Sequence, residues 1–72
     1  MTEEIRAELA ASVLSVLVTV GERVEPGAAV VLLDSMKMEI PVLCSIGGLV
    51  TDLGVAAGDS VQEGDLLVIV AS

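Results

Sequence analysis

The chain contains a single lysine, at position 37, within the segment Asp34-Ser35-Met36-Lys37-Met38-Glu39-Ile40-Pro41. Its primary amine is the one side chain here that can form a stable amide with an activated acyl group. A modification directed at amines is therefore expected on Lys37 or on the N-terminal amine. An ordinary solvated lysine on a turn explains the composition and position equally well.

The sequence lacks the residues that nucleophilic catalysis and zinc binding usually require. The chain has no histidine and one cysteine, Cys44, so a catalytic triad, a Cys–His dyad or a zinc site cannot be assembled. A lone cysteine in an apolar stretch is usually a small core residue. Cys44 also has no partner for an internal disulfide, which is typical of a protein in the reducing cytoplasm.

The charge balance disfavours two classes of partner. Eleven acidic residues against three basic ones give a net charge of −8, whereas nucleic acids and anionic membrane surfaces attract cationic patches. The longest uncharged stretch, from Leu9 to Gly21, is too short for a membrane-spanning helix. Glu3 and Glu4 stand where a signal peptide would be basic. We expect no nucleic acid and no membrane partner, and we assign the acidity to solubility.

An internal repeat organises the chain around Lys37. Residues 18–33 align with residues 55–70 at an offset of 37, and both copies share the pattern Gly-acidic-x-Val-x-x-Gly followed by an aliphatic run. The identical pairs are Val18 with Val55, Gly21 with Gly58, Val24 with Val61, Gly27 with Gly64 and Val31 with Val68. Such self-similarity predicts two halves of like structure.

Each half is predicted to consist of short strands. Leu14, Val16 and Val18 lie at alternate positions, with polar Ser15 and Thr19 among their neighbours, which indicates a half-buried strand. The valine within each Gly-x-x-Val-x-x-Gly unit is expected in the core, and the runs 30–33 and 66–70 are expected to form strands buried on both faces. No segment shows a convincing helical period. The 72 residues are therefore predicted to form one monomeric all-β domain, a flattened barrel or sandwich of two sheets with approximate two-fold symmetry.

The lysine segment joins the two halves. Strand signals lie on both sides of it, at residues 30–33 and 40–43, so the chain must reverse near Met36-Lys37. Tight hairpins normally place glycine or asparagine at such a tip, because the central residues need positive φ. Met36, Lys37 and Met38 are poor choices for a turn, which favours a functional role for the tip. Alternatively, the methionines fold back onto the sheets and fill gaps.

The segment Asp34-Ser35-Met36-Lys37-Met38-Glu39 resembles the biotin attachment motif Glu-Ala-Met-Lys-Met-Glu. The whole chain is similar to the biotinyl/lipoyl carrier domain family, and closest to a stand-alone biotin carrier protein of the biotin carboxyl carrier type. Pro41 and the paired glycine turns fit the family as well. Ser35 stands where alanine is usual and Ala11 where glycine is frequent, and we expect these changes to leave the site intact.

This resemblance implies two four-stranded antiparallel sheets, a barrel-sandwich hybrid, with the lysine on an exposed hairpin. It implies biotin attached covalently to Lys37 by a biotin ligase, with Met36 and Met38 recognised by the ligase and by partner enzymes. It also implies that the domain is not itself an enzyme. The biotin would carry a carboxyl group from a biotin carboxylase to a carboxyltransferase, a chemistry used in fatty acid biosynthesis.

Two other functions remain open from the sequence. A lipoyl carrier shares the fold, but its lysine usually lies in an Asp-Lys-Ala context rather than between Met36 and Met38. An unmodified structural or interaction module would carry no group on Lys37. The substrate that becomes carboxylated is not indicated by any residue.

Overall fold

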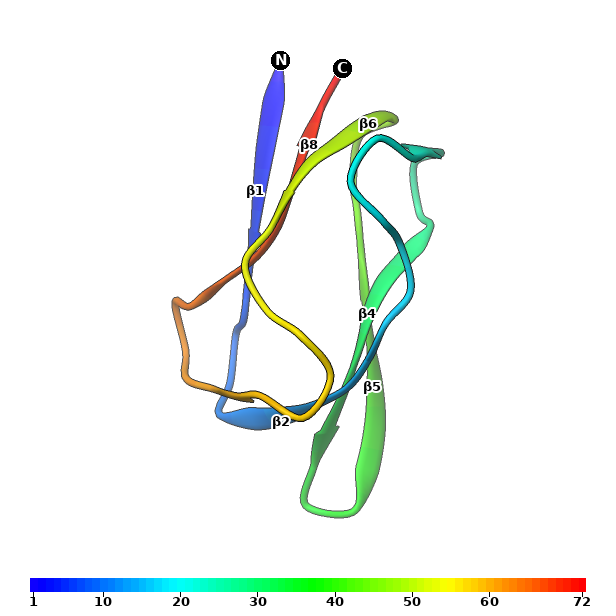
Figure 1. Ribbon diagram of the computed structural model, residues 1–72. Helices are drawn as coiled ribbons and strands as arrows, with labels where there is room; N and C mark the ends of the chain where they lie inside the picture. The colour runs from blue at the N-terminus through cyan, green and yellow to red at the C-terminus, as the bar shows by residue number, and fades with distance from the viewer.

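The computed structural model describes residues 1–72, which form eight strands and no helix. The strands lie in two four-stranded antiparallel sheets, ordered β1-β8-β6-β3 and β5-β4-β2-β7, and the sheets do not close into a barrel (Figure 1). The predicted fold class is confirmed. No helix is available that is long and apolar enough to cross a membrane. The strands are β1 (Thr2–Arg6), β2 (Ala11–Val16), β3 (Arg23–Val24), β4 (Ala29–Ser35), β5 (Met38–Leu43), β6 (Gly48–Leu53), β7 (Ser60–Val61) and β8 (Leu66–Ala71).

The predicted two-fold relation between the halves is visible in their hydrogen bonds. Gly21 N–H donates to Val50 O and Gly58 N–H donates to Val13 O, both at 2.8 Å, and each pair maps onto the other at the offset of 37. Both glycines have positive φ, +92° and +94°, a conformation that side-chain-bearing residues rarely adopt. The short strands β3 and β7 each pair with a strand of the other half, so the halves interlock.

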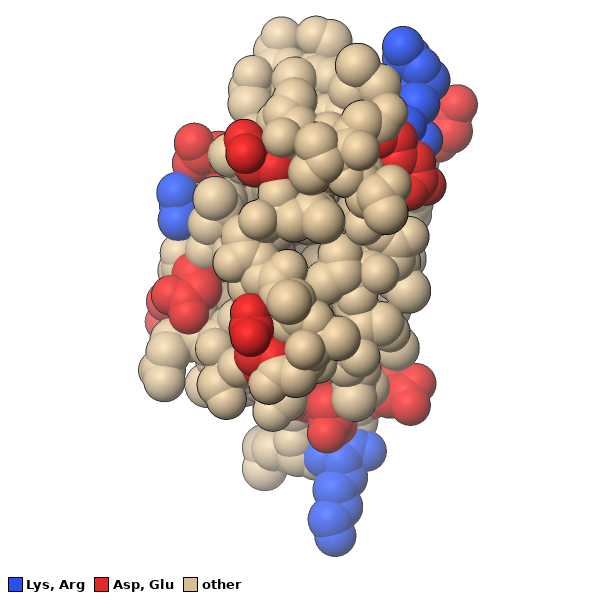
Figure 2. Space-filling view, viewed as in Figure 1, with Lys and Arg blue, Asp and Glu red and all other residues tan.

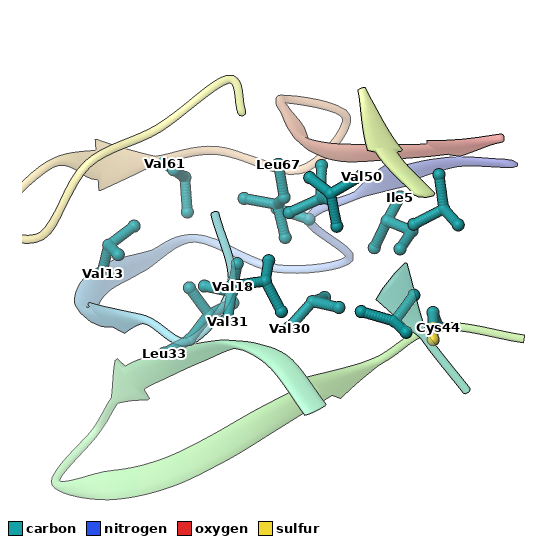
Figure 3. Packing of buried hydrophobic residues seen from close by; sticks show 14 residues of the cluster. Ile5, Val13, Val18, Val30, Val31, Leu33, Cys44, Val50, Val61 and Leu67 are labelled. Atoms are coloured by element: carbon teal, nitrogen blue, oxygen red, sulfur yellow. The ribbon is translucent and has the colours of Figure 1, made fainter. Parts of the chain in front are cut away.

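Aliphatic side chains from both sheets meet in a single core (Figure 3). Val24 and Val61, the valines of the repeated glycine unit, are buried as predicted, and Cys44 is a buried free thiol. No charged or polar side chain is buried. With aromatic residues absent, burial of branched aliphatic side chains supplies the stabilisation, at about 25 cal/mol per Å² of apolar surface.

Two expectations about strand faces are wrong, and β-bulges explain both. Val13 pairs with Leu33 but Ser15 pairs with Leu32, so Leu14 is an extra residue. Leu14 is consequently 42% exposed, while Val13 rather than Leu14 enters the core. A bulge inserts one residue without a partner and shifts the alternation of faces after it.

The aliphatic runs are also not buried on both faces. A register shift between Ala29 and Val31 places Val30 and Val31 side by side in the core. Leu32, which follows them, faces outward and is half-buried. The second half repeats this arrangement, with Leu67 and Val68 buried and Ile69 half-buried. An uninterrupted apolar run therefore reflects a bulged strand with one buried face.

The edge strands β1 and β5 border an open groove of about 590 Å³ along the seam between the sheets. The Glu3 carboxylate crosses this seam from β1 and accepts hydrogen bonds from the Ser45 hydroxyl and from the backbone N–H groups of Ser45 (2.9 Å) and Ile46 (3.3 Å). These bonds, the Ser45 hydroxyl first among them, hold the pKa of Glu3 below its ordinary value, against a smaller opposing effect of burial. Glu3 thus fastens the first strand to the segment that follows β5.

Candidate functional site

The β4–β5 hairpin forms one end of the molecule, and both termini lie at the other end (Figure 1). Ser35 pairs with Met38, so Met36 and Lys37 are the two residues of a tight turn. This is the reversal that the flanking strand signals predict. The molecule is 33 Å long and 17 Å in each other dimension, so the turn lies at the far point of an elongated scaffold.

Met36 and Lys37 have positive φ angles of +52° and +66°. They are the only residues besides glycine in the left-handed region. Positive φ at both central residues gives a turn whose twist matches that of the flanking strands, and Asn-Gly is its usual sequence. A residue with a β-carbon held there costs about 1–3 kcal/mol. The backbone of the tip is therefore strained, whereas Asn-Gly at the same two positions would not be.

The side chains of the tip project into solvent. Met36 is 92% exposed and Met38 is 62% exposed, so the alternative in which the methionines fold back and fill gaps is wrong. Lys37 is also exposed, and the only ion pair of the molecule joins Arg6 and Glu4 at 2.9 Å, far from the tip in sequence. One basic side chain extends from this end of the molecule, with acidic side chains at its base (Figure 2). The Lys37 amine is therefore exposed and has no ion-pair partner.

The base of the hairpin is fastened by Ser35. Its hydroxyl donates to the carbonyl oxygen of Ala10 at 3.2 Å, one residue before β2 begins. The outermost paired residues of β2 and β4 are Ser12 and Asp34, so this side-chain bond continues the contact toward the tip. In the sequence Ser35 is only a replacement for the usual alanine. Its role was missed because the bond joins residues 25 positions apart.

The residues around the tip offer no other reactive group. The structure contains no group of three or more His, Cys, Asp or Glu residues that could hold a metal ion. The Cys44 thiol is buried and donates to the carbonyl oxygen of Glu25 at 3.1 Å. What this end of the molecule can do chemically is to present one primary amine, between two exposed thioethers, on a rigid two-stranded support.

Comparison with known proteins gives consistent results. The family described as "Biotin-requiring enzyme" matches residues 3–70. The biotinylated protein TB7.3 homolog of Mycobacterium leprae is 48% identical over 71 residues, which cover 99% of this chain and 100% of that protein. The biotin carboxyl carrier protein of Streptococcus mutans is 34% identical over 65 residues, covering 90% of this chain and 50% of that protein.

A solved structure agrees with these matches. The crystal structure of the Kluyveromyces lactis urea carboxylase contains a region that superposes with a TM-score of 0.91 at 28% identity, covering 99% of this chain and 6% of that one. Family, relatives and fold therefore coincide over nearly the whole sequence. The chain belongs to the biotin/lipoyl attachment domain family, a family of carrier domains that are not themselves catalytic.

Proposed function

We propose that this protein is a biotin carboxyl carrier and that a biotin ligase attaches biotin to the side-chain amine of Lys37. The observation that carries the proposal is the position of the only lysine: it occupies a strained two-residue turn at the far end of a carrier-family scaffold, exposed and free of ion pairs. The relatives named as biotinylated or biotin-carrying proteins support biotin as the group.

The attachment step defines what the chain contributes. The Lys37 amine, after losing a proton, attacks the acyl carbon of biotinyl-adenylate, an amide bond forms, and AMP leaves with the electrons of the broken anhydride bond. No base lies against the amine, so the ligase must accept the proton and supply the activated acyl group. The hairpin contributes presentation, because a rigid support lowers the entropy lost when the amine enters an active site.

The proposed work of the attached biotin is to take up CO₂ on a ureido nitrogen at a biotin carboxylase and release it at a carboxyltransferase. The lysine side chain acts as the arm, and tethering keeps its load at high effective concentration near both partners. The termini lie at the other end of the molecule, so the arm stays unobstructed by them (Figure 1). Acyl-CoA carboxylation for fatty acid biosynthesis, in the cytoplasm, is the proposed setting.

Met36 and Met38 are proposed as recognition residues for the ligase and its partner enzymes. Each exposes a flexible, polarisable thioether beside the amine, a type of side chain that adapts to different apolar surfaces. These two residues also favour biotin over lipoate, because lipoyl lysines usually lie in an Asp-Lys-Ala context.

Intact mass spectrometry of the protein produced in a host that contains both biotin ligase and lipoyl ligase tests the function. We expect a single biotinyl increment. A lipoyl increment without a biotinyl one would make the protein a lipoyl carrier. Unmodified protein, in the presence of active ligase and added biotin, would make it an interaction module.

A further inference from the structure

The internal two-fold relation provides a comparison between the outer faces of the two sheets. Each outward residue of the hairpin-bearing sheet has a counterpart 37 positions away in the other sheet, in the same backbone environment. The two outer faces can therefore be compared position by position, and they differ in polarity.

The outer face of the hairpin sheet is apolar beside the tip. Leu14 lies in the bulge of β2, beside Ser15, which pairs with Leu32. Leu32 in turn pairs with Pro41 on β5. Leu43 follows on β5, and Leu14 and Leu43 are 42% and 54% exposed. The outer strip, which comprises Leu14, Leu32, Pro41 and Leu43, therefore crosses β2, β4 and β5.

The counterparts of the outer strip in the other sheet are mostly polar, namely Thr51, Ile69, Glu4 and Arg6. Arg6 and Glu4 form an ion pair, and the Thr51 hydroxyl bonds to the Ile69 carbonyl oxygen at 3.4 Å. That sheet does expose one leucine, Leu49. Leu49 pairs with Ala71 on one side and with Arg23 on the other, so it does not lie beside Glu4 or Arg6. Leu49 provides a matched reference, because it is 41% exposed.

Charge differs between the faces as well. Between the outer strip and the tip, Asp34 pairs directly with Glu39 across β4 and β5, and neither carboxylate has an ion-pair partner. Like charges placed opposite each other across strands destabilise a sheet. The equivalent pair in the other sheet is Thr2 with Ala71, which is neutral. The hairpin sheet thus carries a cost that its counterpart avoids.

We propose that the outer strip, with Asp34 and Glu39 at its edge, is the surface on which the biotin ligase docks while it acylates Lys37. This inference rests on the proposed function. The occupant is a protein surface with an apolar centre flanked by Lys or Arg side chains, which would pair with the two unpaired carboxylates. Such a patch, apolar at its centre and charged at its rim, has the usual anatomy of a protein interface.

The test replaces residues of the outer strip by those that the other sheet carries at the same positions. Leu14→Thr and Leu43→Arg copy Thr51 and Arg6, so the backbone tolerates them, and Leu49→Thr is the control. Steady-state biotinylation by purified ligase should show KM raised about tenfold in the double variant, with kcat unchanged, because a few side chains at the centre of an interface carry most of its binding energy and the outer strip is the proposed centre. Leu49→Thr should retain the KM of the wild type.

A second measurement does not depend on turnover. In amide spectra of isotopically labelled Lys37→Ala protein titrated with ligase, we expect shifts or broadening at residues 14, 32 and 43 and none at 51, 69 and 6. Unchanged KM in the double variant, or equal perturbation of both faces, would overturn the docking surface while leaving the carrier function intact. Failure of the wild type to become biotinylated would instead overturn the proposed function itself.

Discussion

At the scale of single residues, the tip combines a strained backbone with an exposed primary amine. Met36 and Lys37 occupy left-handed backbone conformations of +52° and +66°, where asparagine and glycine are favoured. Neither favoured residue could present an amine. The strain is consistent with selection for what the side chains do rather than for the turn that they make.

Replacing the two tip residues by Asn-Gly should therefore stabilise the fold. For Met36→Asn combined with Lys37→Gly we expect a gain of about 1 kcal/mol, or about 4–8 °C in Tm for a domain of this size. Thermal unfolding followed by circular dichroism measures it. Lys37→Ala alone keeps a β-carbon at positive φ and should stay within about 0.5 kcal/mol of the wild type. An unchanged or lower Tm for the Asn-Gly variant would show that the turn is not strained.

The residue types that define the site could be read from the sequence, but part of their surroundings could not. A solitary lysine between strand signals predicts an exposed tip, and the structure places Lys37 there. The bond from Ser35 to Ala10 has no local signature, because it depends on how β2 and β4 align. Side-chain contacts between distant segments follow from register, which composition does not encode.

At the scale of elements, the hydroxyl of Ser35 limits how freely the hairpin moves. Beyond the pair Ser12–Asp34, this bond joins the hairpin end of β4 to the segment before β2. A neutral hydrogen bond contributes about 0.5–1.5 kcal/mol, enough to alter the opening equilibrium of a hairpin end by several-fold. One side chain, Ser35, thus sets how often the end of the hairpin opens.

Ser35→Ala should accelerate local opening of the tip without affecting the core. Amide hydrogen exchange at Lys37 and Met38 should become about 2- to 10-fold faster, as expected for the loss of one such bond. Ser35→Thr retains a hydroxyl and should exchange at rates near those of the wild type. Equal exchange rates in the alanine and threonine variants would show that the Ser35 hydroxyl does not hold the hairpin in place.

The positions of the strands were easier to predict from the sequence than which side chains of each strand point into the core. The offset of 37 gave the two-fold relation because both copies keep the glycines and the core valine that the turn requires. The bulges at Leu14 and Val30 were not predicted, because in a run of aliphatic residues an extra residue does not change the sequence pattern. The bulge in β2 turns Leu14 outward and thereby adds it to the outer strip beside the tip.

At the scale of the whole molecule, the two sheets are held together by an aliphatic core and fastened along one seam by Glu3. Because the pKa of Glu3 is lowered in the folded state by the Ser45 hydroxyl and the backbone N–H groups, its ionised form stabilises the fold. That contribution is complete above the ordinary carboxyl pKa of about 4.3 and is lost as pH falls through the lowered folded value. Mild acid should therefore weaken this seam.

Glu3→Gln should remove this part of the pH dependence. We expect a loss of less than about 1 kcal/mol at pH 7, since a partly exposed carboxylate is screened by solvent, and a smaller fall in stability between pH 7 and pH 3 than in the wild type. Urea unfolding at several pH values measures both. Glu63→Gln, at an exposed residue with no side-chain bond, serves as the control. Equal pH profiles for Glu3→Gln and the wild type would contradict the role of Glu3.

Peptide mapping after incubation with biotin ligase, biotin and ATP tests the central claim most directly. Trypsin cleaves after lysine and arginine, which this chain carries only at positions 6, 23 and 37. Acylation of Lys37 blocks one of these sites, so the account predicts an uncleaved peptide of residues 24–72 that carries one biotin. Cleavage after Lys37, with biotin absent or found on the N-terminal peptide, would contradict it.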